Sequence, residues 1–115
     1  MAAPQFIYHI ASVSDWKAQV QSSEYSNDSL EEEGFIHCSK YEQLEGTLKR
    51  FFENREDILI LKMDTKMMNV PVIYEAADDG SGFFPHVFGV IQKKAVMETL
   101  SFPFNFLINP PQTKA

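Results

Sequence analysis

The stretch that most constrains the fold is Ile58-Leu59-Ile60-Leu61-Lys62-Met63, which is apolar at nearly every position. Successive side chains of a strand point to opposite faces, so this strand would carry apolar side chains on both faces. Both faces must then be covered by other parts of the chain. We therefore expect residues 58–63 to form a central strand with a packing layer on each side, ended by Asp64.

The rest of the chain contains enough apolar material to build those layers. Of its 115 residues, 44% are hydrophobic, including ten Phe. A chain of this size buries a core without needing disulfides or a metal. We see no repeat and no linker, and we expect a single domain over residues 1–115, with a core at about 6–108 and flexible ends at 1–4 and 110–115.

Runs of β-branched and aromatic residues predict further strands. The first is expected at 6–10, another within Gly34-Phe35-Ile36-His37-Cys38-Ser39, and a third at 72–76. An apolar segment at 83–91 leads through a turn at 92–94 into a final strand at 95–102. In the strand at 72–76, Ile73 and Glu75 share one face, opposite Tyr74.

Three serines followed by an acidic residue three positions on predict helix starts. Ser12 is expected to cap a helix that runs to about residue 21, and Ser29 is expected to open one helical turn before Gly34. Ser39, with Glu42, is expected to cap the longest helix, which carries an apolar stripe to about residue 54. The Glu31–33 run is interpreted as a solvated turn rather than a ligand.

Composition limits the partners that this protein can have. Sixteen acidic and ten basic residues give a net charge of -6, which argues against nucleic acid as a partner. The single cysteine, Cys38, cannot form an intramolecular disulfide, and the N-terminus lacks the layout of a secretory signal. No apolar run approaches the about 18 residues of a membrane span. We expect a cytoplasmic protein without membrane association.

The segment Gly34-Phe35-Ile36-His37-Cys38-Ser39 joins a strand to a helix and carries several reactive side chains. Alternation puts Phe35, His37 and Ser39 on one face and Cys38 on the other, where Cys38 is expected to be a small buried hydrophobe. If Ser39 caps the helix, the backbone N–H groups at the helix start suit an anion beside His37. The junction is therefore a candidate binding element.

Three histidines stand in three separate apolar segments: His9, His37 and His86. We expect at least two of them to share one pocket, because titratable groups with shifted pKa values gather at functional sites. The alternative is that each ring is a hydrogen-bonded core group. Glu75 is either an exposed residue of an edge strand or the carboxylate that orients a histidine or holds a ribose hydroxyl. None shows the short paired spacing of a zinc site, so we expect no metal.

The remaining candidates are aromatic or lie in a loop. The tyrosines can stack on a base, although core packing is the commoner role at their spacings; they are Tyr8, Tyr41 and Tyr74. The loop at 78–82 is rich in Gly and Asp, and we expect it to gate the site that His86 helps to form. The apolar stretch at 104–107 is expected either to dock on the core or to form a homodimer.

Taken together, these motifs resemble the uncharacterised family called domain of unknown function 952. The resemblance covers about residues 6–96 and rests on Ile7-Tyr8-His9-Ile10, Ser29-Leu30, Glu33-Gly34-Phe35-Ile36-His37-Cys38-Ser39, Gln43, Tyr74-Glu75 and Phe84-Pro85-His86-Val87-Phe88-Gly89. That family is grouped with the ADP-ribosyltransferase-like superfamily. Membership implies a small split β-sandwich with helices and a cleft for NAD or an ADP-ribose-like group.

The resemblance also implies roles for single residues. His9 would match the first-strand histidine that contacts the adenosine-side ribose, and Glu75 would match the carboxylate on the nicotinamide ribose. His37 and Ser39 are similar to the His-x-Ser of the RNA 2'-phosphotransferase branch, while His86 belongs to the family's own Phe-Pro-His motif. The sequence has no arginine beside these histidines and no clear match to the superfamily's stacking tyrosine.

We therefore expect an α+β domain with a mainly antiparallel, split β-sheet and two main helices. Its expected function is the binding of NAD or an ADP-ribose-like nucleotide, as a transferase or glycohydrolase. The expected catalytic residues are His37, Glu75 and His86, and the expected ligand-binding residues are Tyr8, His9, His37, Ser39, Glu75 and His86. Two alternatives remain: an inert nucleotide- or metabolite-binding module, and a structural or interaction protein whose histidines are structural.

Overall fold

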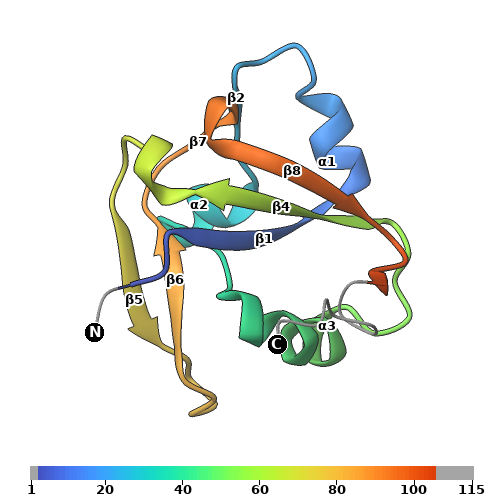
Figure 1. Ribbon diagram of the computed structural model, residues 1–115, viewed down its shortest axis with the longest axis vertical. Helices are drawn as coiled ribbons and strands as arrows, with labels where there is room; N and C mark the ends of the chain where they lie inside the picture. The colour runs from blue at the N-terminus through green and yellow to red at the C-terminus, as the bar shows by residue number, and fades with distance from the viewer. Residues whose placement is uncertain (1–2, 106–115) are drawn as a thin grey trace, which may run out of the picture.

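The computed structural model describes residues 3–105, and its centre is a three-stranded antiparallel sheet in the order β1-β4-β8 (Figure 1). These strands span Phe6–Ser12, Ile58–Asp64 and Val96–Ser101. In β4, residues 58–61 and Met63 are all buried, on both faces of the sheet. The expectation of a central strand covered on both sides is confirmed, and the apolar pattern explains why no other strand takes the centre.

One face of this sheet packs against smaller sheets and two helices. Ile7 and Ala11 of β1 meet Ile36, Val87 and other apolar side chains there. Those residues belong to a second sheet, ordered β3-β6-β5 (Ile36–His37, Phe83–Val87, Val72–Ala76), and to a β2-β7 pair (Glu24–Tyr25, Ile91–Gln92). Helices α1 (Val13–Ala18) and α2 (Asp28–Glu33) complete this layer.

The opposite face of the β1-β4-β8 sheet is covered by helix α3 (Leu44–Phe51), which lies below the sheet in Figure 1. Leu44 packs there against Tyr8, Ile60 and Phe104, with Leu48 at the edge of the cluster. Phe104, at the start of the stretch expected to dock or dimerise, is therefore part of this protein's own core. Residues 106 and 107 of that stretch lie outside the described residues.

The coarse fold expected from the sequence agrees with this arrangement: helices and strands are mixed, and every strand pair is antiparallel in residues 3–105. The two main helices and the one helical turn expected from the sequence are observed in this part of the chain as three short α-helices. Three 3₁₀ helices accompany them, at Tyr41–Gln43, Thr65–Met67 and Lys93–Ala95. No helix in this part of the chain is long and apolar enough to cross a membrane.

The predicted N-caps were right at one helix and wrong at two. Ser12 Oγ accepts a hydrogen bond from the backbone N–H of Asp15 at 3.0 Å, as expected. Helix α2 is instead capped by Asn27, whose Oδ1 accepts from the N–H of Ser29 at 3.2 Å. The hydroxyl of Ser29 donates to the carbonyl of Phe35 at 2.7 Å, so it ties the helix to the strand that follows.

Ser39 does not cap the helical segment after it. Its backbone forms a bridge with β1: the N–H of Tyr8 donates to Ser39 O at 2.9 Å and the N–H of Ser39 donates to Tyr8 O at 2.7 Å. This bridge keeps Ser39 extended, so the helical turn starts one residue later. Gln43 then reaches back, and its Oε1 accepts from the N–H of Lys40 at 2.8 Å. The premise of the predicted anion site, a helix start capped by Ser39, is therefore wrong.

Candidate functional site

A cleft of about 870 Å³ opens where β1, the β3-β6-β5 sheet, α3 and the β5–β6 loop meet. Five of the six residues predicted to bind a ligand line it: His9, His37, Ser39, Glu75 and His86. Tyr8 is the exception, because its side chain packs in the core between the central sheet and α3. Its ring centroid lies 5.7 Å from that of Tyr41. The expected convergence of the histidines is thus observed in the geometry.

Strand register explains why these side chains meet. In the β3-β6 pair, His37 lies directly opposite His86, and in the β5-β6 pair Ile73 lies opposite His86. Glu75 is two residues beyond Ile73 on the same face, so it is the diagonal neighbour of His86. The alternate residues of these strands, such as Val87, face the core instead. One face of the small sheet therefore carries the polar groups of the cleft.

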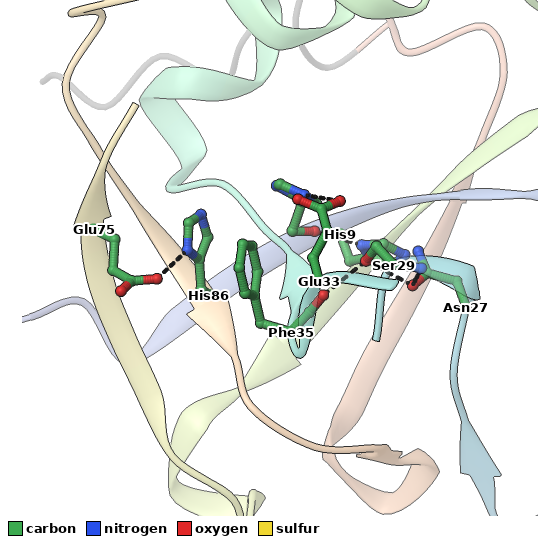
Figure 2. A network of polar contacts seen from close by, with 8 residues as sticks. His9, Asn27, Ser29, Glu33, Phe35, Glu75 and His86 are labelled. Atoms are coloured by element: carbon green, nitrogen blue, oxygen red, sulfur yellow. Dashed lines mark hydrogen bonds and ion pairs between the residues drawn. The ribbon is translucent and has the colours of Figure 1, made fainter. Parts of the chain in front are cut away.

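His86 and Glu75 form the tighter of two histidine–carboxylate pairs (Figure 2). The Nδ1 atom of His86 lies 2.7 Å from Oε1 of Glu75, and the His86 side chain is only 12% exposed. Since a carboxylate only accepts, His86 Nδ1 carries the proton of this hydrogen bond, and in the neutral ring Nε2 is left as an acceptor. Phe35 stacks on the other side of the His86 ring, with centroids 4.0 Å apart and planes 11° apart.

His37 forms the second pair, with Glu33. Its Nε2 lies 3.1 Å from Oε2 of Glu33, and its side chain is 56% exposed. Gly34 ends α2 in the left-handed conformation, with φ of 89°, which turns the chain so that β3 runs back beside the end of the helix. The interpretation of Glu33 as part of a solvated acidic turn is therefore incomplete, because this residue lines the cleft.

The two pairs are joined by a cluster of rings. The centroids of His37 and His86 lie 5.3 Å apart, and those of Phe35 and His37 lie 4.9 Å apart in an edge-to-face arrangement. Phe35 thus packs against both imidazoles, and it restricts how either ring can rotate. Phe35 stands between His86 and Glu33 in Figure 2, at the centre of the polar network.

His9 is a structural residue at the wall of this cleft. Its Nδ1 donates to the carbonyl of His37 at 2.7 Å, and its Nε2 accepts from the hydroxyl of Tyr25 at 3.1 Å. Burial lowers the pKa of His9 to about 4, and burial also raises the pKa of Tyr25, so both groups keep these roles at neutral pH. Because both ring nitrogens are occupied, the structural alternative describes His9 better than direct ribose contact.

Sequence reasoning missed the arginine of the cleft. Arg50 lines it from α3, together with Thr47, and its Nε lies 3.8 Å from Oδ2 of Asp79 in the β5–β6 loop. The sequence has no arginine next to its histidines, but the fold brings Arg50 to the cleft that the three histidines line. A signal was present, since Thr47 and Arg50 are spaced i and i+3, beside the apolar stripe that includes Leu44 and Leu48.

Two further expectations concern Cys38 and metal binding. Cys38 is buried, as predicted, and burial raises the pKa of its thiol, so it stays protonated. Within residues 3–105, no group of three or more His, Cys, Asp or Glu residues is arranged to hold a metal ion.

The fold and the cleft define a small α+β protein with antiparallel sheets, few helices and two histidine–carboxylate pairs. The chain belongs to the family described as "Protein of unknown function (DUF952)", whose model matches residues 10–99. The family expected from the sequence motifs is confirmed. A search of curated proteins finds no match.

Solved structures with the same fold come from protein CC0527 of Caulobacter crescentus. Its crystal structure is 26% identical to this chain, covers 82% of both chains and superposes with a TM-score of 0.70. The solution NMR structure of CC0527 is 25% identical, covers 85% of this chain and 84% of that one, and has a TM-score of 0.71. A double mutant of the same protein gives 27% identity and a TM-score of 0.70 over 82% of each chain.

Proposed function

We propose that the cleft binds NAD or an ADP-ribose-like nucleotide, and that the protein acts on it as a transferase or glycohydrolase of the ADP-ribosyltransferase-like superfamily. The observation that carries this proposal is the convergence of His37–Glu33, His86–Glu75 and Arg50 on one cleft of about 870 Å³. Ligand pockets are usually about 300–1,000 Å³ and combine apolar walls with a few convergent polar groups. This cleft meets both criteria.

The lining fits the parts of such a ligand. Glu75 is a carboxylate that can accept hydrogen bonds from ribose hydroxyls, and Arg50 is a cation suited to phosphate. Phe84 and Phe51 supply apolar surface to the same cleft. NAD is the substrate in this proposal, and the bond that breaks is its glycosidic bond.

The chemistry proposed for the histidine–carboxylate pairs follows from their hydrogen bonds. Glu75 holds His86 through Nδ1, which orients the ring and supports the positive charge that His86 gains on taking a proton at Nε2. His86 thus serves as general base toward a water or an acceptor hydroxyl. A carboxylate beside the ligand also stabilises the positive charge that develops on a sugar ring as a glycosidic bond breaks. His37, held by Glu33, is the second proton-transfer group.

Titration of ¹⁵N-labelled protein with NAD and with ADP-ribose tests the proposal. We expect amide shifts at His37, Ser39 and His86 at millimolar ligand, together with release of free nicotinamide on long incubation with NAD. The variant Glu75→Gln keeps the size of the side chain and removes its charge, so it should still bind and should lose about 100-fold in turnover. Glu98→Gln is the matched control, since Glu98 lies on β8, pairs with Lys62 of β4 and does not line the cleft.

The possible outcomes separate the alternatives. Absence of shifts at these residues at millimolar ligand would contradict the proposal. Binding that survives Glu75→Gln, with no product from the wild-type protein, would instead assign the cleft to an inert nucleotide-binding module. Equal loss of turnover in Glu75→Gln and Glu98→Gln would exclude the role given to the His86–Glu75 pair.

A further inference from the structure

The charges around the cleft are unbalanced. Among the described residues that line it, Arg50 is the one with a permanent positive charge, whereas four carry carboxylates: Glu33, Glu75, Asp78 and Asp79. Glu33 and Glu75 are bonded to histidines, while Asp79 forms an ion pair with Arg50. An anionic ligand that enters this cleft therefore has one strong cationic partner, and that partner is already paired.

The ion pair between Arg50 and Asp79 is open to exchange. The Nε–Oδ2 distance is 3.8 Å, and the two side chains are 38% and 50% exposed. Exposed pairs with this geometry contribute little to stability, because water screens the attraction and two flexible side chains must be ordered. A phosphate with two or three acceptor oxygens is a stronger partner for a guanidinium than one distant carboxylate oxygen.

Asp79 is held at this position by its own loop. Its Oδ1 accepts from the N–H of Ser81 at 2.9 Å, and the N–H of Ala77 donates to the carbonyl of Gly82 at 2.8 Å, which closes the loop between β5 and β6. Gly80 has φ of 76°, a conformation that favours glycine. Hydrogen bonding from Ser81, first from its side chain and then from its backbone N–H, lowers the pKa of Asp79, so this carboxylate is charged at neutral pH.

Two neutral hydroxyl side chains, Thr47 and Ser39, also line the cleft. Thr47 is three residues before Arg50 on α3, and residues at this spacing lie on the same side of a helix. The Oγ1 of Thr47 lies 3.4 Å from the Oγ of Ser39, and both residues line the cleft. A Cβ at Gly46 would lie 3.4 Å from Nη1 of Arg50, so the guanidinium rests over this helical turn, on the helix that also carries Thr47.

We propose that Ser39, Thr47 and Arg50 form a subsite for a phosphate or pyrophosphate group, and that Asp79 competes with this anion for Arg50. Binding of the anion then releases Asp79, and with it the loop at 77–82, from α3. The assignment rests on the proposed function in that a nucleotide would bring these phosphates. It adds the residues that recognise the anion and a carboxylate that limits its affinity.

Inorganic pyrophosphate is the probe, because it carries the anionic group without a base or sugar. Binding is followed by amide shifts and by the Nε–Hε signal of Arg50 in ¹⁵N-labelled protein. We expect shifts at Arg50, Thr47 and Asp79 in the wild type and affinity at least about tenfold weaker in Arg50→Gln. Lys49→Gln is the matched control: it removes the neighbouring charge on α3, which pairs with Glu45 and does not line the cleft.

Competition by Asp79 has its own test. Asp79→Asn keeps an oxygen that can accept from Ser81, so the loop should be retained while the competing charge is lost. We expect pyrophosphate to bind about two- to fivefold more tightly to this variant, as the removal of one exposed ion pair predicts. Asp78→Asn removes the same charge from the adjacent residue, whose carboxylate forms no ion pair with Arg50 in the part of the chain described, and should have a smaller effect.

Three results would overturn the inference: no shift of the Arg50 Nε–Hε signal at tens of millimolar pyrophosphate, equal affinities in Arg50→Gln and wild type, or equal effects of Asp79→Asn and Asp78→Asn. Failure here is distinct from failure of the proposed function. Binding of ADP-ribose that is insensitive to Arg50 would leave the nucleotide proposal standing without this subsite. Pyrophosphate binding with the expected variant effects, but without any response to NAD, would retain the anion subsite and remove the NAD assignment.

Discussion

At the scale of single residues, His9 shows how the fold settles a question that the sequence leaves open. The ring is fully enclosed between the carbonyl of His37 and the hydroxyl of Tyr25, and it is only 3% exposed. The Tyr25 ring in turn packs against Trp16 at 5.7 Å. Because a charged imidazole at this site would lose its hydration, the folded protein binds a proton at His9 far less readily than the unfolded chain does.

This difference predicts a loss of stability in mild acid. The pKa of His9 is about 4 in the folded protein, against 6.5 for an unperturbed histidine, so the unfolded state binds the extra proton between these values. The contribution of neutral His9 to the free energy of unfolding is fully present above about pH 6.5 and decreases as the pH drops toward 4. From pH 7.5 to pH 4.5 we expect the free energy of unfolding to decrease by about 2 to 3 kcal/mol because of His9 alone.

Urea unfolding of the wild type and of His9→Gln at both pH values measures how much His9 contributes to this pH dependence. Glutamine can hydrogen-bond but does not titrate, so the variant should lose less stability than the wild type over the same interval, whatever its stability at pH 7.5. Identical pH dependence in the two proteins would show that His9 is not responsible.

At the scale of elements, the connection between β6 and β7 depends on one close approach. A Cβ at Gly89 would lie 2.5 Å from Cγ1 and 2.9 Å from Cβ of Val70, distances that real side chains do not tolerate. Val70 packs on the core, and its Cβ cannot move without the backbone. The neighbouring N–H of Phe88 donates to the carbonyl of Pro71 at 2.9 Å, so this connection is tied to the chain segment that leads into β5.

We therefore expect Gly89→Ala to lower the free energy of unfolding by about 1 to 3 kcal/mol, the usual range for overpacking. The same change at Gly46, where a Cβ would make an ordinary 3.4 Å contact with Arg50, should stabilise the protein by up to about 1 kcal/mol through helix propensity. Chemical denaturation of the two variants measures the contrast. If Val70→Ala failed to reduce the cost of Gly89→Ala in the double variant, steric contact with Val70 would not be its cause.

At the scale of the whole molecule, one sheet separates two apolar clusters. Trp16 packs on the cluster that contains Ile7 and Leu61, and Phe104 belongs to the cluster between the sheet and α3. Strand β4 contributes buried side chains to both clusters, because its successive residues point to opposite faces. The two clusters should therefore unfold together rather than one after the other.

Phe104→Ala tests this coupling. Removal of a Phe side chain that is 8% exposed should lower the free energy of unfolding by about 3 to 5 kcal/mol. The single tryptophan, Trp16, reports from the opposite face, and its fluorescence should show the full shift in one cooperative transition. Phe83→Ala, at a side chain that is 60% exposed, should shift it much less. An unshifted Trp16 transition in Phe104→Ala would mean that the two clusters unfold independently.

The sequence alone determined the central strand, the cap at Ser12 and the buried state of Cys38. These features follow from local alternation and local hydrogen bonds, which neighbouring residues decide. The caps at Ser29 and Ser39 were mispredicted because both residues found partners outside their own turn: Ser29 through its hydroxyl to Phe35, and Ser39 through its backbone to Tyr8. A pattern of neighbouring residues does not reveal a hydrogen-bond partner that another segment supplies.

The tertiary structure decided which polar groups share the cleft. Glu33 meets His37 because Gly34 reverses the chain, and Glu75 meets His86 because the β5-β6 register makes them diagonal neighbours. Arg50 arrives from α3, and Tyr25 takes the second nitrogen of His9. These pairings depend on strand register and on packing between elements distant in sequence, whose free energy is spread over the whole core. The sequence therefore specified the chemistry that the cleft contains, and only the fold specified which groups act on one another.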